Sequence, residues 1–233
     1  MNPLLDIPIS KIREALLMMS SLAERNFILA IQALNERDGN IADRVEQDDD
    51  QLDRLEIDVD ELVMGYMATR GPVATDCRLA LVAPKISSNL ERIGDESTTI
   101  ARCSRLLNRE RPLGPAYDLS RIVEISSKML YESITAFVEH SPDLALKIVA
   151  RDREVDDLHK ELVRDLIDCM KKDPGTIDRG INLIRVLKSI ERIADHATSI
   201  AEDVYYLYRA EDIRHSPAEH EKTGSPTEES PPA

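Results

Sequence analysis

The residues with the clearest chemical potential are acidic side chains spaced four positions apart. Glu91 and Asp95 form one such pair, and Glu191 and Asp195 form another. Residues four apart lie on the same face of a helix, where two carboxylates repel each other unless a cation is close. Oxygen ligands of this kind suit divalent and trivalent metal ions. The spacing therefore predicts paired metal ligands on helices.

Two further acid pairs precede these, Asp49 with Asp53 and Asp152 with Asp156. In a helical projection they flank the edge of an apolar stripe, whereas the later pairs point away from the stripe of their own helices. We expect each half of the chain to bring two pairs together on an open surface, outside the core. The predicted metal ligands are Asp49, Asp53, Glu91, Asp95, Asp152, Asp156, Glu191 and Asp195.

Other interpretations of these acids remain open at this point. A solvated acidic surface, softened by Arg92 or Arg192, is the simplest alternative in a chain that is 32% charged. His159 and His196 adjoin the second-half acids and could add nitrogen ligands, but most such histidines are polar surface residues. Inward-facing Glu-x-x-His sets, glycine-rich phosphate loops and Ser-His-Asp arrangements do not stand out, so catalysis has little support.

Six segments with apolar residues at helical spacing must position the acids, and Gly or Pro accompanies each break between them. The all-α class is also favoured by the composition, with eight Gly, two Phe and no Trp. The expected helices are Ile9 to Glu36, Asn40 to Thr69, Val73 to Asn108, Asp118 to Glu139, Pro142 to Lys172 and Ile177 to Arg209.

An internal repeat relates the two halves. LERIGDESTTIA, at residues 90–101, aligns with IERIADHATSIA, at residues 190–201, and seven of the twelve positions are identical. The helix before each of these segments carries the earlier acid pair, at an offset of 103 rather than 100. The pattern predicts two pseudo-symmetric three-helix bundles, at residues 1–112 and 113–211. Residues 212–233, rich in Ser, Pro, Glu and Thr, are expected to form a disordered tail.

Charge and cysteine content exclude several classes of protein. The chain has 44 acidic residues against 30 Lys and Arg, a net charge of −14, which disfavours nucleic-acid binding. The three cysteines have no CxxC spacing, so neither a disulfide framework nor a zinc knuckle is indicated. A run of 18 apolar residues is missing, and the N-terminal residues do not follow a signal-peptide pattern. We expect a cytoplasmic protein without direct membrane insertion.

The repeated motifs resemble those of the PhoU phosphate-signalling proteins. The resemblance rests on DDQLDRLEIDVDELV, GPVATDCR and LERIGDESTTIA in the first half, and on DREVDDLHKELV and IERIADHATSIAEDVYYL in the second. It extends from Ile9 to Tyr208. It implies two three-helix bundles related by a pseudo-twofold axis, whose acid motifs hold iron or zinc clusters, or ions such as Mg²⁺ or Mn²⁺. Ser97 and Thr98 depart from the residues usual after the first-half motif.

The resemblance also implies a function. PhoU-like proteins restrain the phosphate-starvation response when phosphate is plentiful, acting with the ATPase subunit of a phosphate ABC transporter and a phosphate-sensing histidine kinase. A non-catalytic adaptor is therefore expected, as a possible homodimer. Two alternatives stay open: an accessory regulator of a Pit-type phosphate permease, and a carboxylate-bridged metal-dependent hydrolase.

Overall fold

The computed structural model describes residues 3–113 and 118–214, and within these ranges the regular elements are helices. The all-α prediction is confirmed. The tail predicted from residue 212 lies, apart from residues 212–214, outside the described residues. The elements are α1 (Pro3–Glu36), α2 (Gly39–Arg70), α3 (Ala74–Leu107), α4 (Ser120–Val138), α5 (Pro142–Val149), α6 (Asp152–Lys172), the short 3₁₀ helix η1 (Pro174–Thr176) and α7 (Ile177–Arg209).

The predicted breaks coincide with capping residues. The side chain of Asp38 accepts a hydrogen bond from the backbone N–H of Asn40 at the start of α2. Gly71 ends that helix in the left-handed conformation, with a φ of 56°. Ser141 caps α5, and Pro142 occupies its first turn, where the missing N–H costs nothing. Local sequence therefore determines these helix ends.

The prediction of a single helix from Pro142 to Lys172 is wrong, because α5 and α6 are separate. The backbone N–H of Arg151 donates to the carbonyl of Ile148 at 2.9 Å, which tightens the chain into a turn. The Arg151 guanidinium pairs with Glu132 on α4. Neither Gly nor Pro stands at this break, so the sequence lacks a signal for it. The consequence is that Asp152 lies in the first turn of α6.

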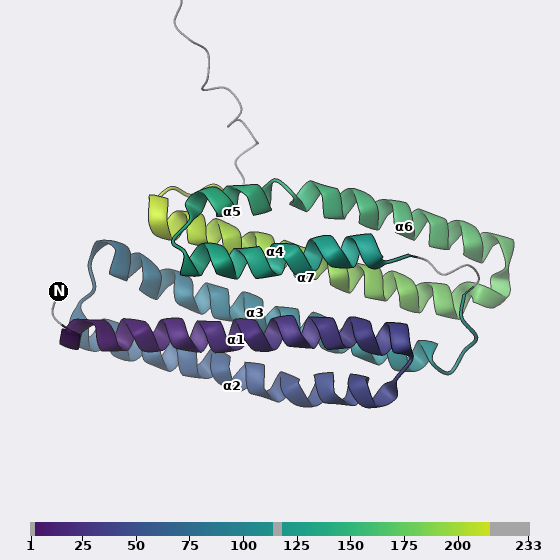
Figure 1. Cartoon of the computed structure of the whole chain (residues 1–233), viewed down its shortest axis with the longest axis horizontal. Coiled ribbons are helices and arrows are strands. Elements are labelled where there is room, and N and C mark those ends of the chain that lie inside the picture. The colour runs from purple at the N-terminus through teal and green to yellow at the C-terminus, as the bar shows by residue number, and fades with distance from the viewer. Residues whose placement is uncertain (1–2, 114–117, 215–233) are drawn as a thin grey trace, which may run out of the picture.

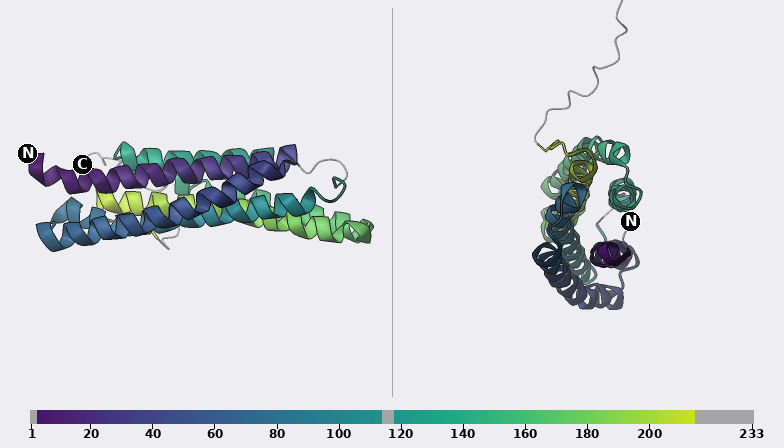
Figure 2. Two further views of the ribbon diagram at one scale, coloured as in Figure 1. Left: turned by 90° about the horizontal axis from the view of Figure 1, so that it is seen from below. Right: turned by 90° about the vertical axis from the view of Figure 1, so that its left-hand side faces the viewer.

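The six long segments form two three-helix bundles that lie against each other (Figure 1). Helices α1, α2 and α3 make the first bundle, and α4, the α5–α6 segment and α7 make the second. Helices α3 and α7 run side by side in the middle, and α2 and α6 pack on their outer flanks. Viewed end-on, α1 and α4 lie together on one side of these helices (Figure 2). The two halves thus present equivalent helices to each other.

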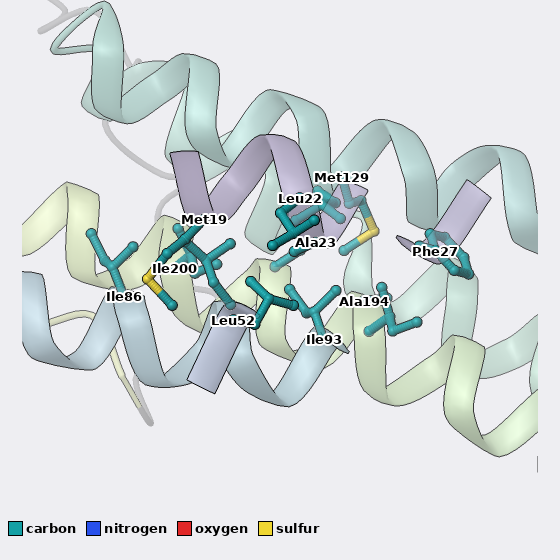
Figure 3. Packing of buried hydrophobic residues seen from close by; sticks show 14 of the residues in the cluster. Met19, Leu22, Ala23, Phe27, Leu52, Ile86, Ile93, Met129, Ala194 and Ile200 are labelled. Carbon is teal, nitrogen blue, oxygen red and sulfur yellow. The ribbon is translucent and has the colours of Figure 1, made fainter. Parts of the chain in front are cut away.

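Both bundles share one hydrophobic core. Phe27 of α1, Met129 of α4 and Ala194 of α7 belong to a single cluster of buried residues, as do Leu52 and Ile93 of the first bundle (Figure 3). These side chains are 0–1% exposed. Because the core is continuous across α3 and α7, it fixes the positions of these two acid-bearing helices relative to each other.

A close approach of α2 and α3 occurs at Gly94. A Cβ atom added there would lie 2.4 Å from Leu52 Cδ1 and 3.0 Å from Asp49 Oδ1, too near for either atom to stay in place. The second half has Ala194 and Val155 at the corresponding positions. Where alanine replaces the glycine, the smaller valine thus replaces the leucine that packs against it. This compensation keeps the acid-bearing helices close together in both halves.

Candidate metal centre

Three of the predicted ligands in the second bundle meet at the α6–α7 contact. Asp156 of α6 and Glu191 and Asp195 of α7 each offer a carboxylate oxygen, and these oxygens lie within 4.8 Å of one another. Glu191 and Asp195 are one turn apart on α7, and Asp156 lies one turn after the start of α6. We refer to these three residues, with Asp152, as the second centre.

The second centre is more deeply placed than the helical projection predicted. Glu191 is only 9% exposed, so the expectation that all eight acids lie outside the core is wrong for this residue. Its carboxylate is bonded by the Lys188 ammonium from the preceding turn. Asp152 and Asp156 are half-buried, and Asp195 is exposed. The burial of Glu191 and its ion pair with Lys188 were not predicted, although the i, i+3 spacing of the two residues is visible in the sequence.

Burial and mutual repulsion make the second centre favour positive charge. Although the Asp195 residue is exposed to solvent, desolvation by the protein atoms around its carboxyl group, followed by repulsion from Glu191 and Asp152, raises its pKa to about 7, and Lys188 opposes this rise. The pKa of Asp152 is raised mainly by burial, even though the Thr198 hydroxyl donates a 3.0 Å hydrogen bond to its Oδ1. Without a bound cation, Asp195 is therefore only partly ionised near neutral pH.

The two second-half histidines have different surroundings. His159 lies beside the centre with Nε2 buried and without a hydrogen-bond partner among the described residues. Burial lowers its pKa, while the Glu191 and Asp156 carboxylates act in the opposite direction. Nδ1 of His196 instead lies 2.9 Å from Asn89 Oδ1 across the α3–α7 contact. His159 thus has an unpartnered, buried nitrogen among the described residues, close enough to the acids to be influenced by Glu191 and Asp156.

The first centre consists of Asp49 and Asp53 of α2 with Glu91 and Asp95 of α3. Burial, then Asp95 and Asp53, raise the pKa of Asp49 to about 6. Burial, then Asp95, Glu56 and Asp53, raise the pKa of Glu91 to about 7. Glu56, which sequence reasoning left out, thus adds a fifth negative charge. The four acids influence one another, but over the described ranges three carboxylates gather within 4.8 Å only at the second centre.

The donor set at both centres fits divalent cations. All eight predicted ligands are carboxylates, the class that Mg²⁺, Mn²⁺ and Ca²⁺ prefer, and His159 supplies a nitrogen suited to transition metals. The pKa values of Asp49, Glu91 and Asp195 are raised first by burial and then by neighbouring acids, and a bound cation would relieve the repulsion between these acids. A cavity of about 760 Å³ elsewhere, between α1, α3, α4 and α7, is lined by none of these acids. The eight acids thus lie apart from this cavity, and their binding of ions stays a prediction.

Comparison with known proteins also finds a domain that occurs twice in the chain. The model of the PhoU domain matches the chain twice, at residues 16–104 and 119–204. The chain belongs to the PhoU family. Each match contains one centre, so the internal repeat is a repeat of the PhoU domain. Within the ranges that the structure describes, no helix is long and apolar enough to cross a membrane.

Individual PhoU relatives match over most of their length. The phosphate-specific transport system accessory protein PhoU homolog of Pseudomonas aeruginosa is 38% identical over 88% of this chain and 85% of its own length. The homolog of the same name in Aquifex aeolicus is 34% identical over 87% of this chain and 92% of its own.

Solved structures agree with the fold. The crystal structure of PhoU from Pseudomonas aeruginosa superposes with a TM-score of 0.85, at 36% identity, covering 88% of this chain and 99% of the other. The PhoU structure from Streptococcus pneumoniae gives a TM-score of 0.83 at 24% identity, covering 89% of this chain and 98% of the other, which supports the fold alone.

Proposed function

We propose that this chain is a non-catalytic regulator that restrains the phosphate-starvation response when phosphate is plentiful. Its partners in this proposal are the ATPase subunit of a phosphate ABC transporter and a phosphate-sensing histidine kinase, met at the cytoplasmic side. The observation that carries the proposal is the double PhoU domain match, supported by relatives named as accessory proteins of phosphate-specific transport. A homodimer is the oligomeric state we propose.

Metal binding is the second part of the proposal. Asp49, Asp53, Glu91 and Asp95 would hold ions at the first centre, and Asp152, Asp156, Glu191 and Asp195 would hold them at the second. The candidate ions are Mg²⁺ or Mn²⁺, or iron or zinc clusters. Bound cations would neutralise two acidic areas on one protein and so change which partner surface the protein fits. The support is the carboxylate donor set and the raised pKa values of its members.

An adaptor role is favoured over catalysis by the setting of the acids. They lie at helix–helix contacts, and none of them lines the 760 Å³ cavity. A hydrolase would hold substrate in a concave site next to its metal ions. Hydrolysis of phosphate esters by metal-loaded protein, abolished by Asp53→Ala or Asp156→Ala, would instead establish the metal-dependent hydrolase.

A phosphate-starvation reporter in the source organism tests the regulatory proposal. Deleting the gene is expected to switch the reporter on in phosphate-rich medium, and the intact gene supplied in trans is expected to restore silence. A reporter that stays silent after deletion contradicts the proposal. If phosphate uptake changes while the reporter does not, the Pit-type permease accessory becomes the better assignment.

The metal proposal has its own test within the same strain. A gene carrying Glu91→Gln, Asp95→Asn, Glu191→Gln and Asp195→Asn together should give a folded protein that does not restore reporter silence. The matched control changes four exposed acids away from the centres, Asp58, Glu61, Asp165 and Asp168, to their amides. Full restoration by the centre variant would show that regulation does not need the metal ligands.

A further inference from the structure

The two centres differ in the charge of the residue one turn before their glutamates. In the aligned repeats, Lys188 lies three residues before Glu191, and Ser88 lies three residues before Glu91. Residues three apart on a helix are neighbours, so the Lys188 side chain reaches back over the Glu191 carboxylate. Its Nζ bonds Glu191 Oε2. The serine at the first centre is too short and carries no charge.

The position of Lys188 places its charge where an ion would bind. Glu191 Oε2 belongs to a carboxylate whose side chain is only 11% exposed, and Lys188, at 45%, lies on the solvent side of it. The same glutamate is one of the three acids whose oxygens lie within 4.8 Å of one another. A metal ion that binds these three acids therefore shares the Glu191 carboxylate with the ammonium group of Lys188.

We propose that Lys188 is an internal counter-ion of the second centre, which a divalent cation displaces from Glu191 as it binds. This proposal rests on the metal binding proposed above and adds a residue that sets affinity at one centre only. The lysine stabilises the metal-free state, because it compensates the charge of a buried carboxylate. It also repels the incoming cation. Both effects raise the ion concentration at which the second centre fills, and neither acts at the first centre.

Exchanging the two equivalent residues tests the proposal on the full chain. The probe is MnCl₂ at pH 8, with free Mn²⁺ followed by electron paramagnetic resonance. Glu91→Gln with Asp95→Asn disables the first centre and isolates the second. In that background, Lys188→Ser is expected to tighten Mn²⁺ binding about fivefold, the effect expected for a partly exposed ion pair.

The reciprocal exchange uses the other centre. With the second centre disabled by Glu191→Gln and Asp195→Asn, Ser88→Lys is expected to weaken Mn²⁺ binding at the first centre about fivefold. The matched control is Lys171→Ser, which removes the same charge from another i, i+3 pair, with Asp168, near the end of α6. That variant should leave the dissociation constant of either centre unchanged.

The outcomes distinguish the role of Lys188 from metal binding by the acids. If Mn²⁺ binds with the same dissociation constant before and after both exchanges, the proposed role of Lys188 is overturned, while the proposed metal binding is supported. An equal gain from Lys171→Ser also overturns it, because the effect would then be one of net charge. Failure of the wild-type chain and all variants to bind Mn²⁺ overturns both proposals.

Discussion

Single carboxylates at the two centres are held in an environment that disfavours their charge. Asp49, Glu91 and Asp195 have pKa values raised to between about 6 and about 7, with burial as the largest cause and neighbouring acids next. Each of these residues therefore opposes folding when it ionises without a cation. In the metal proposal, a bound cation would relieve this repulsion and so stabilise the folded chain.

The first prediction concerns Glu91 and pH. Its pKa is about 7 in the folded chain against 4.5 for an unperturbed glutamate, so the unfolded chain ionises first between these two pH values. The folded state then binds more protons, and stability falls as pH rises through this window. Glu91→Gln removes this loss. With chelator present, the free energy of unfolding of the variant relative to wild type should rise by about 1 kcal/mol as the pH increases from 4.5 to 8. This figure is reduced to allow for solvent screening of the partly exposed side chain.

Urea unfolding at several pH values measures that difference. Glu61→Gln, an exposed change on α2, is the control and should show a difference from wild type that does not vary with pH. A Glu91→Gln difference that is equally flat would show that the carboxylate is not disfavoured in the folded chain.

At the scale of helices, the contact between α2 and α3 depends on paired residue sizes. Gly94→Ala gains about 1 kcal/mol of helix propensity but forces a methyl group against Leu52, and overpacking costs about 1–3 kcal/mol. We predict a net loss of about 1 kcal/mol. Adding Leu52→Val, which reproduces the pair of the second half, should recover most of it.

Urea unfolding of the two single variants and the double variant checks this compensation. The control is Gly65→Ala in α2, where an added Cβ meets nothing within 4 Å. That change should stabilise the helix by about 1 kcal/mol. Additive effects of Gly94→Ala and Leu52→Val would contradict the steric explanation.

For the whole molecule, the shared core predicts that the bundles unfold together. Phe137 of α4 is 2% exposed, and Phe137→Ala should destabilise the chain by about 3–5 kcal/mol. Amide hydrogen exchange followed by mass spectrometry should accelerate in α2 and α3 as well as in α4–α7. The control is Ile57→Ala, at a side chain that is 59% exposed. Faster exchange confined to the second bundle would indicate two independent units.

Metal removal is also expected to act on the whole molecule. An ion present at about 100 times its dissociation constant adds roughly 2.7 kcal/mol to the free energy of unfolding. Chelation should therefore lower the melting temperature, and MnCl₂ should restore it. Protein with Glu91→Gln, Asp95→Asn, Glu191→Gln and Asp195→Asn should not respond to either treatment. An identical melting temperature of wild type with and without chelator would favour a solvated acidic surface.

The sequence by itself determined the features that depend on nearby residues. Apolar spacing and Gly or Pro at the breaks predicted the helices, and α7 spans Ile177–Arg209 as expected. The repeat predicted two equivalent bundles, which the PhoU match confirms. It also pointed to the eight acids, whose metal binding stays a prediction. These patterns are local because one turn of a helix is set by residues three and four apart.

Only the tertiary structure decided how these local features combine. The break between α5 and α6 goes with an ion pair from Arg151 to Glu132 on another helix. Glu191 is buried because α6 and its neighbours cover α7, and a helical projection contains one helix only. Whether Asp156 of α6 meets Glu191 and Asp195 of α7 depends on the packing of separate helices. Such contacts join residues distant in sequence, and one chain's periodicity carries no information about them.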